Sequence, residues 1–193
     1  MHESSLPSKG AMKAEAQAAG RKMEGLIAYI AAGDRSAFVE LYSQVKTAVY
    51  SFAFSILRNK HDAEDVMQEA FVKIHNAAAS YLPNGKPMAW ILTIVKNESL
   101  MKLRAQKRWE PLPDEERKLP AATGQEDASV NRLVLNEALA ILSDEERQIV
   151  FLYSVSGLKH REIAALLQLP LSTTLSKYRR ALSKLKKQLK EDM

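Results

Sequence analysis

Residues 161–189 read REIAALLQLPLSTTLSKYRRALSKLKKQL, and this stretch decides the fold. Ile163 and Leu167 give a short first helix one apolar face. Pro170 ends that helix, because proline lacks the N–H donor and crowds the preceding turn. A longer basic helix follows, with Ser172 as its expected N-cap. The pattern predicts a helix-turn-helix, in which the start of the second helix enters the major groove of DNA.

The second helix carries charge of one sign. Residues 172–190 contain seven Lys or Arg and no Asp or Glu. Hydroxyl and basic side chains at the start of such a helix can meet base edges, while later lysines suit phosphates. The expected DNA contacts are Ser172, Thr173, Thr174, Ser176, Lys177, Arg180 and Lys184. A separate stripe is expected to face the core: Leu175, Tyr178, Leu182, Leu185 and Leu189. The alternative, a merely solvated basic helix, leaves the preceding short helix and proline turn unexplained.

The composition is that of a globular protein with a mildly basic balance. The 193 residues are 46% hydrophobic and 26% charged, with a net charge of +5 and no cysteine. The absence of cysteine excludes disulfides and thiolate metal sites and fits a cytoplasmic location. No run of apolar residues is long enough to predict a membrane span, and the N-terminus lacks the apolar segment of a signal peptide.

Helical periodicity recurs along most of the chain. Apolar residues at steps of three and four predict helices over 36–57, 61–79 and 88–108, with Asp62 as a plausible N-cap and Pro87 at a helix start. Residues 110–127 break the pattern with three prolines and a net charge of −4. A capping box of Ser143 and Glu146 then opens a helix that stops near residue 155.

The predicted fold class is therefore all-α. Two small helical domains are joined by a flexible acidic linker, and the C-terminal domain is a helix-turn-helix. The expected segments are a disordered tail over 1–20, a helical domain over 21–108, the linker over 109–129 and the helix-turn-helix domain over 130–193.

The C-terminal segment LNEALAILSDEERQIVFLYSVSGLKHREIAALLQLPLSTTLSKYRRALSKL resembles the fourth conserved region of bacterial sigma factors of the extracytoplasmic-function (ECF) group. Leu142 and Arg147, the Glu162-Ile163-Ala164 run, and Arg180 within the second helix carry the resemblance. The family uses this region to bind the promoter element near position −35. Gln168 stands where the family usually has a turn glycine.

The N-terminal half decides between a sigma factor and other helix-turn-helix proteins. Residues 62–71, DAEDVMQEAF, resemble the family's DAEDxxQExF signature. The resemblance implies docking on the clamp helices of the largest RNA polymerase subunit through Asp62, Asp65, Gln68 and Glu69. With Val66 and Phe71 buried, helical geometry turns those four side chains outward. His61 with Glu64 could hint at a metal ion, but without further ligands the sequence predicts no metal site.

Residues 87–108 resemble the family's segment that recognises and melts the −10 element, on Trp90, Ile94, Asn97 and Arg104. The preceding loop is placed to receive a flipped base. The predicted −10 contacts are Tyr81, Asn84, Lys96, Asn97, Met101, Arg104 and Arg108. For Trp90, core packing is favoured over base stacking.

The sequence as a whole predicts a non-enzymatic sigma factor, with no catalytic residues and no cofactor. The expected partners are core RNA polymerase, at its clamp helices and flap, promoter DNA, and an anti-sigma factor, with no membrane insertion. A stand-alone regulator would leave residues 62–108 unexplained, and a helical-bundle enzyme would need converging carboxylates and histidines. The acidic linker could mimic RNA near the polymerase cleft or simply be a solvated spacer.

Overall fold

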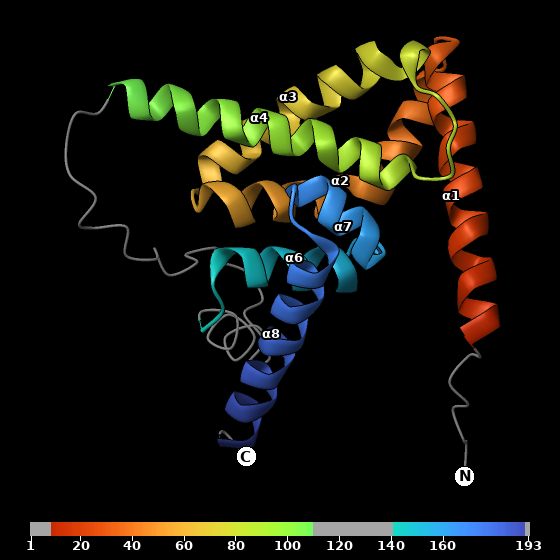
Figure 1. The fold of residues 1–193 in the computed structure, drawn as a ribbon. Helices are drawn as coiled ribbons and strands as arrows, with labels where there is room; N and C mark the ends of the chain where they lie inside the picture. Colours follow the sequence, from red (N-terminus) through yellow and green to blue (C-terminus); the bar gives the residue numbers. More distant parts are fainter. Residues whose placement is uncertain (1–8, 110–140, 192–193) are drawn as a thin grey trace.

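The computed structural model describes residues 9–109 and 141–191, and the side chains of residues 17–106 and 141–188. Within these ranges the chain is helical and contains no strand, which confirms the all-α prediction (Figure 1). The predicted linker over 109–129 and the start of the second domain lie essentially outside the described residues. In chain order the elements are α1 (Lys9–Ala31), α2 (Arg35–Leu57), α3 (Lys60–Ala77), η1 (Ala78–Ser80), α4 (Pro87–Trp109), α6 (Asp144–Ser154), α7 (His160–Leu167) and α8 (Leu171–Glu191).

The first four helices form one bundle around the apolar face of α2. Leu41, Val45, Val49 and Phe52 are completely buried at helical spacing, so this face meets α3 and α4 along its length. Burial of each such side chain contributes roughly 1.5–3 kcal/mol to folding. Asp34 caps α2 by accepting hydrogen bonds from two backbone N–H groups of the first turn.

The helix α1 differs from the sequence-based expectation. A disordered tail was expected through residue 20, yet α1 begins at Lys9 and continues to Ala31. Its second half is anchored because Leu26, Ile27 and Ile30 are buried against the bundle. The sequence of the first half of α1 is polar and rich in alanine. Alanine favours helices but produces no apolar stripe, so the periodicity that predicts a helix is missing there. Residues 1–8 lie outside the described residues.

Several helix ends match their sequence signals and two do not. Pro87 is the first residue of α4, and the capping box of Ser143 and Glu146 opens α6, as predicted. The cap of α3 is Asn59, whose side chain accepts a hydrogen bond from the Asp62 N–H at 3.1 Å; the expectation of Asp62 as the cap was wrong. Likewise, α8 begins at Leu171, so Ser172 lies inside the helix.

The helices α6, α7 and α8 form the helix-turn-helix unit. Gln168 ends α7 in the left-handed conformation, with φ of 58°, at the position where glycine would be expected. The core-facing stripe of α8 is shifted from the prediction. Ala181 is completely buried, whereas Leu182 is 42% exposed and does not belong to the core. The side chain of Leu189 lies outside the described residues.

The helix-turn-helix unit packs directly against the N-terminal bundle. In Figure 1, α6 lies beneath α2 and α7 lies beside α4, while α8 packs against α6 and α7 and extends away from the N-terminal bundle. The Phe52 and Phe151 rings stack in parallel with centroids 6.5 Å apart, and Arg58 pairs with Asp144. The buried apolar residues of both units form one continuous cluster. None of the described helices is long and apolar enough to cross a membrane.

Candidate nucleic-acid and protein interfaces

The acidic side chains of α3 are divided between an outer surface and a contact with α4. Asp65, Gln68 and Glu69 are exposed, as the helical geometry predicts. Asp62 is turned toward α4, where its carboxylate accepts a hydrogen bond from Gln106 at 2.8 Å. The Lys102 ammonium lies 2.8 Å from Asp65 and 3.3 Å from Asp62. The hydrogen bond to Asp65, outweighing partial burial, raises the pKa of Lys102, so this cation stays charged and partly neutralises one edge of the face.

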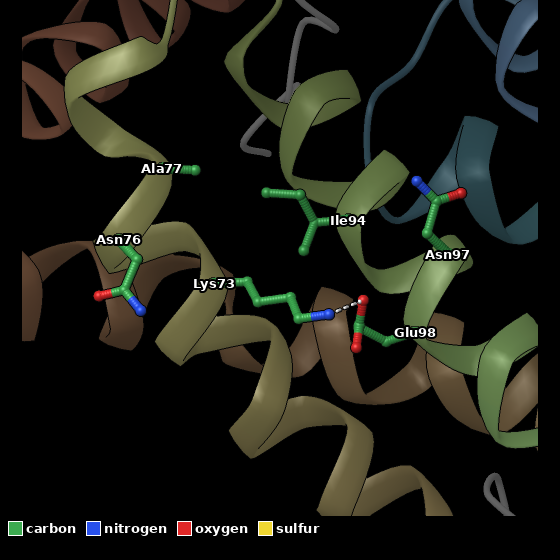
Figure 2. Close-up of a pocket in the computed structure, with 6 residues that line it drawn as sticks. All are labelled: Lys73, Asn76, Ala77, Ile94, Asn97 and Glu98. Carbon is green, nitrogen blue, oxygen red and sulfur yellow. Dashed lines mark hydrogen bonds and ion pairs between the residues drawn. The ribbon is translucent and has the colours of Figure 1, made fainter.

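A pocket of about 400 Å³ opens between α3 and α4. Figure 2 shows its lining, which consists of Lys73, Asn76, Ala77, Ile94, Asn97 and Glu98. The Lys73 ammonium donates to the Glu98 carboxylate at 2.7 Å, and the Glu98 side chain is only 5% exposed. Only Asn97 was predicted from the sequence. Lys73 and Asn76 lie one and two turns beyond Glu69 on α3. This helical spacing continues the polar face of α3, and it was the sequence signal from which the two residues could have been predicted.

The pocket combines apolar walls with amide groups. Ile94 and Ala77 supply apolar contact area, and the two asparagines each offer one acceptor and two donors. An unstacked nucleobase needs both kinds of contact, an apolar or aromatic surface for its face and hydrogen-bonding groups for its edge. The chemistry of the lining is therefore suited to a planar, polar ring.

The loop between η1 and α4 is held by hydrogen bonds. The Tyr81 hydroxyl donates to the Glu24 carboxylate at 2.9 Å, and burial together with this hydrogen bond raises the pKa of Tyr81 to about 12. The Tyr81 ring lies 4.8 Å from the Trp90 ring, and Trp90 packs on the bundle core. Asn84 is exposed, and its side chain accepts a hydrogen bond from the Lys86 N–H at 3.0 Å. Of these predicted contacts, Asn84 is therefore the more accessible, whereas Tyr81 is largely committed to holding the loop.

The predicted contacts on α4 do not all face the same surroundings. Asn97, Met101 and Arg104 are exposed. Lys96 instead donates to the backbone carbonyl of Leu166 in α7 at 2.7 Å, and burial lowers its pKa. The Arg108 side chain lies outside the described residues.

At the start of α8, the predicted contacts separate by exposure. Ser172, Ser176 and Arg180 are exposed, and Thr173 is half-buried. Thr174 is completely buried, and its hydroxyl donates to the Pro170 carbonyl at 3.1 Å. Because its side chain is buried, Thr174 is not part of the exposed surface of α8 in this structure. Arg179 is exposed beside Arg180 and was missed, although the paired arginines were visible in the sequence.

Two of the predicted basic contacts are engaged with acids of α6. Lys177 lies 2.8 Å from Glu145, and Lys184 lies 2.7 Å from Glu146. Glu146 is almost completely buried and also accepts a hydrogen bond from the Ser143 N–H at 3.0 Å. Lys184 therefore compensates a buried carboxylate. The structure thus gives Lys184 a structural role, and its contact with DNA stays a prediction.

Among the described residues there is no group of three or more His, Asp or Glu side chains placed to hold a metal ion. His61 and Glu64, the pair considered from the sequence, lie 3.9 Å apart at the protein surface.

Comparison with known proteins adds a family assignment to this geometry. The chain matches the family model described as Sigma-70 region 2 over residues 41–109 and the model described as Sigma-70, region 4, over residues 132–185. It is 32% identical over 175 residues to the ECF RNA polymerase sigma factor SigE of Mycolicibacterium smegmatis, in an alignment covering 84% of this chain and 66% of that protein. It is 29% identical over 170 residues to the ECF sigma factor SigK of Mycobacterium ulcerans, covering 83% of this chain and 89% of SigK.

Solved structures share the fold. The sigma factor RpoE of Bartonella quintana, in complex with the anti-sigma factor NepR, matches with a TM-score of 0.60 and 26% identity over 81% of this chain and 98% of that chain. CnrH, in complex with the cytosolic domain of CnrY, matches with a TM-score of 0.61 over 89% of this chain and 99% of that chain. Because CnrH is only 23% identical to this chain, the match to CnrH supports the fold alone.

Proposed function

Because the chain belongs to the sigma-70 family, in its ECF group, we propose that it binds core RNA polymerase and directs transcription from promoters with −35 and −10 elements. The observation that carries the proposal is a pocket between α3 and α4, with apolar walls and amide groups, on the same chain as a helix-turn-helix. A stand-alone regulator needs only the helix-turn-helix. The chain performs no catalysis in this role, and it acts in the cytoplasm, where the polymerase works.

The proposed polymerase contact is the exposed edge of α3. Asp65, Gln68 and Glu69 present carboxylates and an amide from one rigid helix, which suits a basic partner surface. Asp62 supports this edge from behind through Gln106 and Lys102.

Charge reversal tests this contact. Asp65→Lys combined with Glu69→Lys should weaken binding to core polymerase by at least about tenfold, because like charges then face each other across the interface. Circular dichroism checks that the helices persist. Glu40→Lys on α2 is the matched control, since it also reverses an exposed helix carboxylate. Unchanged affinity in the double variant would remove the docking assignment.

The proposed −10 contact is the pocket and its surroundings. Separating base pairs costs about 1.4 kcal/mol per step, and favourable contacts with the released strand must offset that cost. An unpaired base packs against Ile94 and Ala77 in the pocket, with an asparagine amide for its edge, while Arg104 holds the backbone. Met101 on α4 and Asn84 in the loop before α4 are exposed and are further proposed contacts of the single strand.

The proposed −35 contact is the exposed start of α8. Ser172, Thr173, Ser176 and Arg180 face the major groove, with Arg179 and Lys177 near the phosphates. Arginine reads guanine through two hydrogen bonds, so Arg180 is the main candidate for base specificity.

A further proposed partner is an anti-sigma factor. RpoE, which resembles this chain, is found in complex with the anti-sigma factor NepR. We extend that class of partner to this chain without assigning it a surface.

The decisive experiment is run-off transcription with purified core polymerase on fragments of genomic DNA. The full chain should produce discrete transcripts that neither core polymerase nor the chain produces alone. Tight binding to duplex DNA as a dimer, with no transcripts in the presence of core polymerase, would instead favour a stand-alone regulator.

A further inference from the structure

Glu24 on α1 holds both ends of the loop that joins η1 to α4. Its Oε1 accepts hydrogen bonds from the Tyr81 hydroxyl at 2.9 Å and from the Gly85 backbone N–H at 2.8 Å. Gly20, one turn earlier on α1, lies against the same loop, since a Cβ built there would be 3.7 Å from the Gly85 carbonyl oxygen. One face of the second half of α1 therefore contacts the loop through Gly20 and Glu24.

The loop needs such an anchor to keep one shape. Leu82, Pro83 and Asn84 at its apex are exposed, with Leu82 at 80%. Gly85 has φ of 73°, a conformation in which glycine is unstrained. Glycine also leaves the unfolded loop many accessible conformations, so ordering it carries an entropic cost. The two hydrogen bonds to the Glu24 carboxylate offset that entropic cost. Glu24 is itself held in place, because α1 is anchored to the bundle by the buried Ile27.

The loop lies in the chain between the two helices that line the pocket. It leaves η1 directly after the end of α3, where Asn76 and Ala77 line the pocket, and it enters α4, which carries Ile94 and Asn97. The Tyr81 ring, oriented by Glu24, lies against Trp90 on α4. A change at Glu24 therefore alters how the loop is held between η1 and α4 while leaving the lining residues of the pocket intact.

We propose that Glu24 is a positioning residue for capture of the unpaired −10 strand, and that α1 thereby takes part in promoter melting. This inference rests on the proposed function, because it assumes that the pocket and the loop receive the released strand. Glu24 itself need not touch DNA. It holds Tyr81 and Gly85 so that Asn84 and the loop apex stay in place.

Three variants and one control separate positioning from general stability. Glu24→Ala removes both hydrogen bonds, whereas Glu24→Gln keeps a carboxamide oxygen at the same place and should retain most of the function. Tyr81→Phe removes one of the two hydrogen bonds and keeps the ring against Trp90. Gly20→Ala is the matched control on the same face of α1, because the added Cβ makes only an ordinary van der Waals contact.

The measurement uses the full chain assembled with core polymerase. The probe is a fluorescent single-stranded oligonucleotide that carries the non-template −10 sequence of a promoter transcribed by the wild-type holoenzyme. Glu24→Ala should lower affinity for this probe roughly tenfold, the loss expected for hydrogen bonds to a charged group, and Tyr81→Phe roughly threefold. Glu24→Gln and Gly20→Ala should remain close to wild type. Open-complex formation by Glu24→Ala should decrease on a duplex promoter. It should largely recover on a template whose −10 region and adjoining downstream DNA are already melted, because strand separation is then no longer required.

Each outcome has a defined meaning. Wild-type probe affinity in Glu24→Ala would overturn the proposal, as would equal losses of core binding and probe binding, which would mean a merely structural role. If Glu24→Ala fails to fold, Tyr81→Phe carries the test, and unchanged probe affinity there overturns the proposal. If the wild-type holoenzyme transcribes no promoter, the proposed function itself fails, and that result is visible before any variant is made.

Discussion

Lys184 offers the sharpest test of how the helix-turn-helix unit is held together. Its ammonium lies 2.7 Å from the Glu146 carboxylate, whose side chain is only 2% exposed. The change that isolates this contact is Lys184→Met, because methionine keeps most of the aliphatic stem and removes the charge. The variant leaves a buried carboxylate without its cation.

The expected loss of stability lies between two limits. Removing one partner of a fully buried ion pair costs about 3–5 kcal/mol, whereas an exposed pair contributes about 0.2–1 kcal/mol. Lys184 is itself 39% exposed, and Glu146 keeps its hydrogen bond from the Ser143 N–H. We therefore expect Lys184→Met to lower the free energy of unfolding by about 2 kcal/mol.

Urea denaturation of the full chain measures this loss. Lys186→Met is the matched control, since Lys186 is an exposed lysine of the same helix, and its replacement should change stability by less than about 0.5 kcal/mol. Adding Glu146→Gln to Lys184→Met should recover part of the loss, because no unpaired charge then remains buried. Equal stabilities of Lys184→Met and Lys186→Met would refute the reasoning and return Lys184 to the phosphate-binding role expected from the sequence.

Two further predictions concern the same unit. Burial alone would raise the pKa of Glu146, but the hydrogen bonds from Lys184 and the Ser143 N–H outweigh it and leave the pKa below its ordinary value. A lowered folded-state pKa stabilises the fold above the unfolded-state pKa of about 4.3, and that contribution disappears as the pH falls through the folded-state value. The free energy of unfolding of wild type and of Lys184→Met is therefore measured from pH 6 downward, and the difference between them should shrink below about pH 4. A difference that stays constant with pH would contradict this prediction. At the DNA surface, Arg180→Ala should weaken binding of a −35 duplex by about 1–3 kcal/mol and relax base preference, whereas Lys177→Ala should cost less, because Lys177 already pairs with Glu145; equal losses measured by fluorescence anisotropy would contradict that ranking.

The sequence was sufficient for the helices whose apolar residues recur at strict spacing. The buried stripes of α2 and α3, the proline at the start of α4 and the capping box of α6 each follow from a local physical rule. The first half of α1 was missed because its alanine-rich sequence produces no stripe, and the helix is secured by residues further along the chain. Local patterns thus locate elements, but they miss a helix whose anchoring lies elsewhere in the sequence.

The candidate sites were harder, because exposure depends on tertiary packing. A helical wheel places Thr174 and Lys184 among polar neighbours, yet Thr174 is completely buried and Lys184 pairs with the buried Glu146. Glu24 could not be connected to Tyr81 and Gly85 at all, because the contact spans about sixty residues of sequence. The pairing of Lys73 with Glu98 across the pocket is a contact of the same kind.

The packed arrangement of the two units has a geometric consequence for promoter binding. Elements near −35 and −10 are about 25 base pairs apart, which corresponds to roughly 85 Å of duplex at 3.4 Å per base pair. Lys96, beside the pocket, bonds to the Leu166 carbonyl at 2.7 Å, and only four residues separate Leu166 from the start of α8. Four intervening residues can span at most about 18 Å between those points. The two proposed reading surfaces therefore lie too close together to engage both elements at once in this arrangement. Reading both requires α6–α8 to separate from α2 and α4, and the same movement would free Lys96 for the −10 strand.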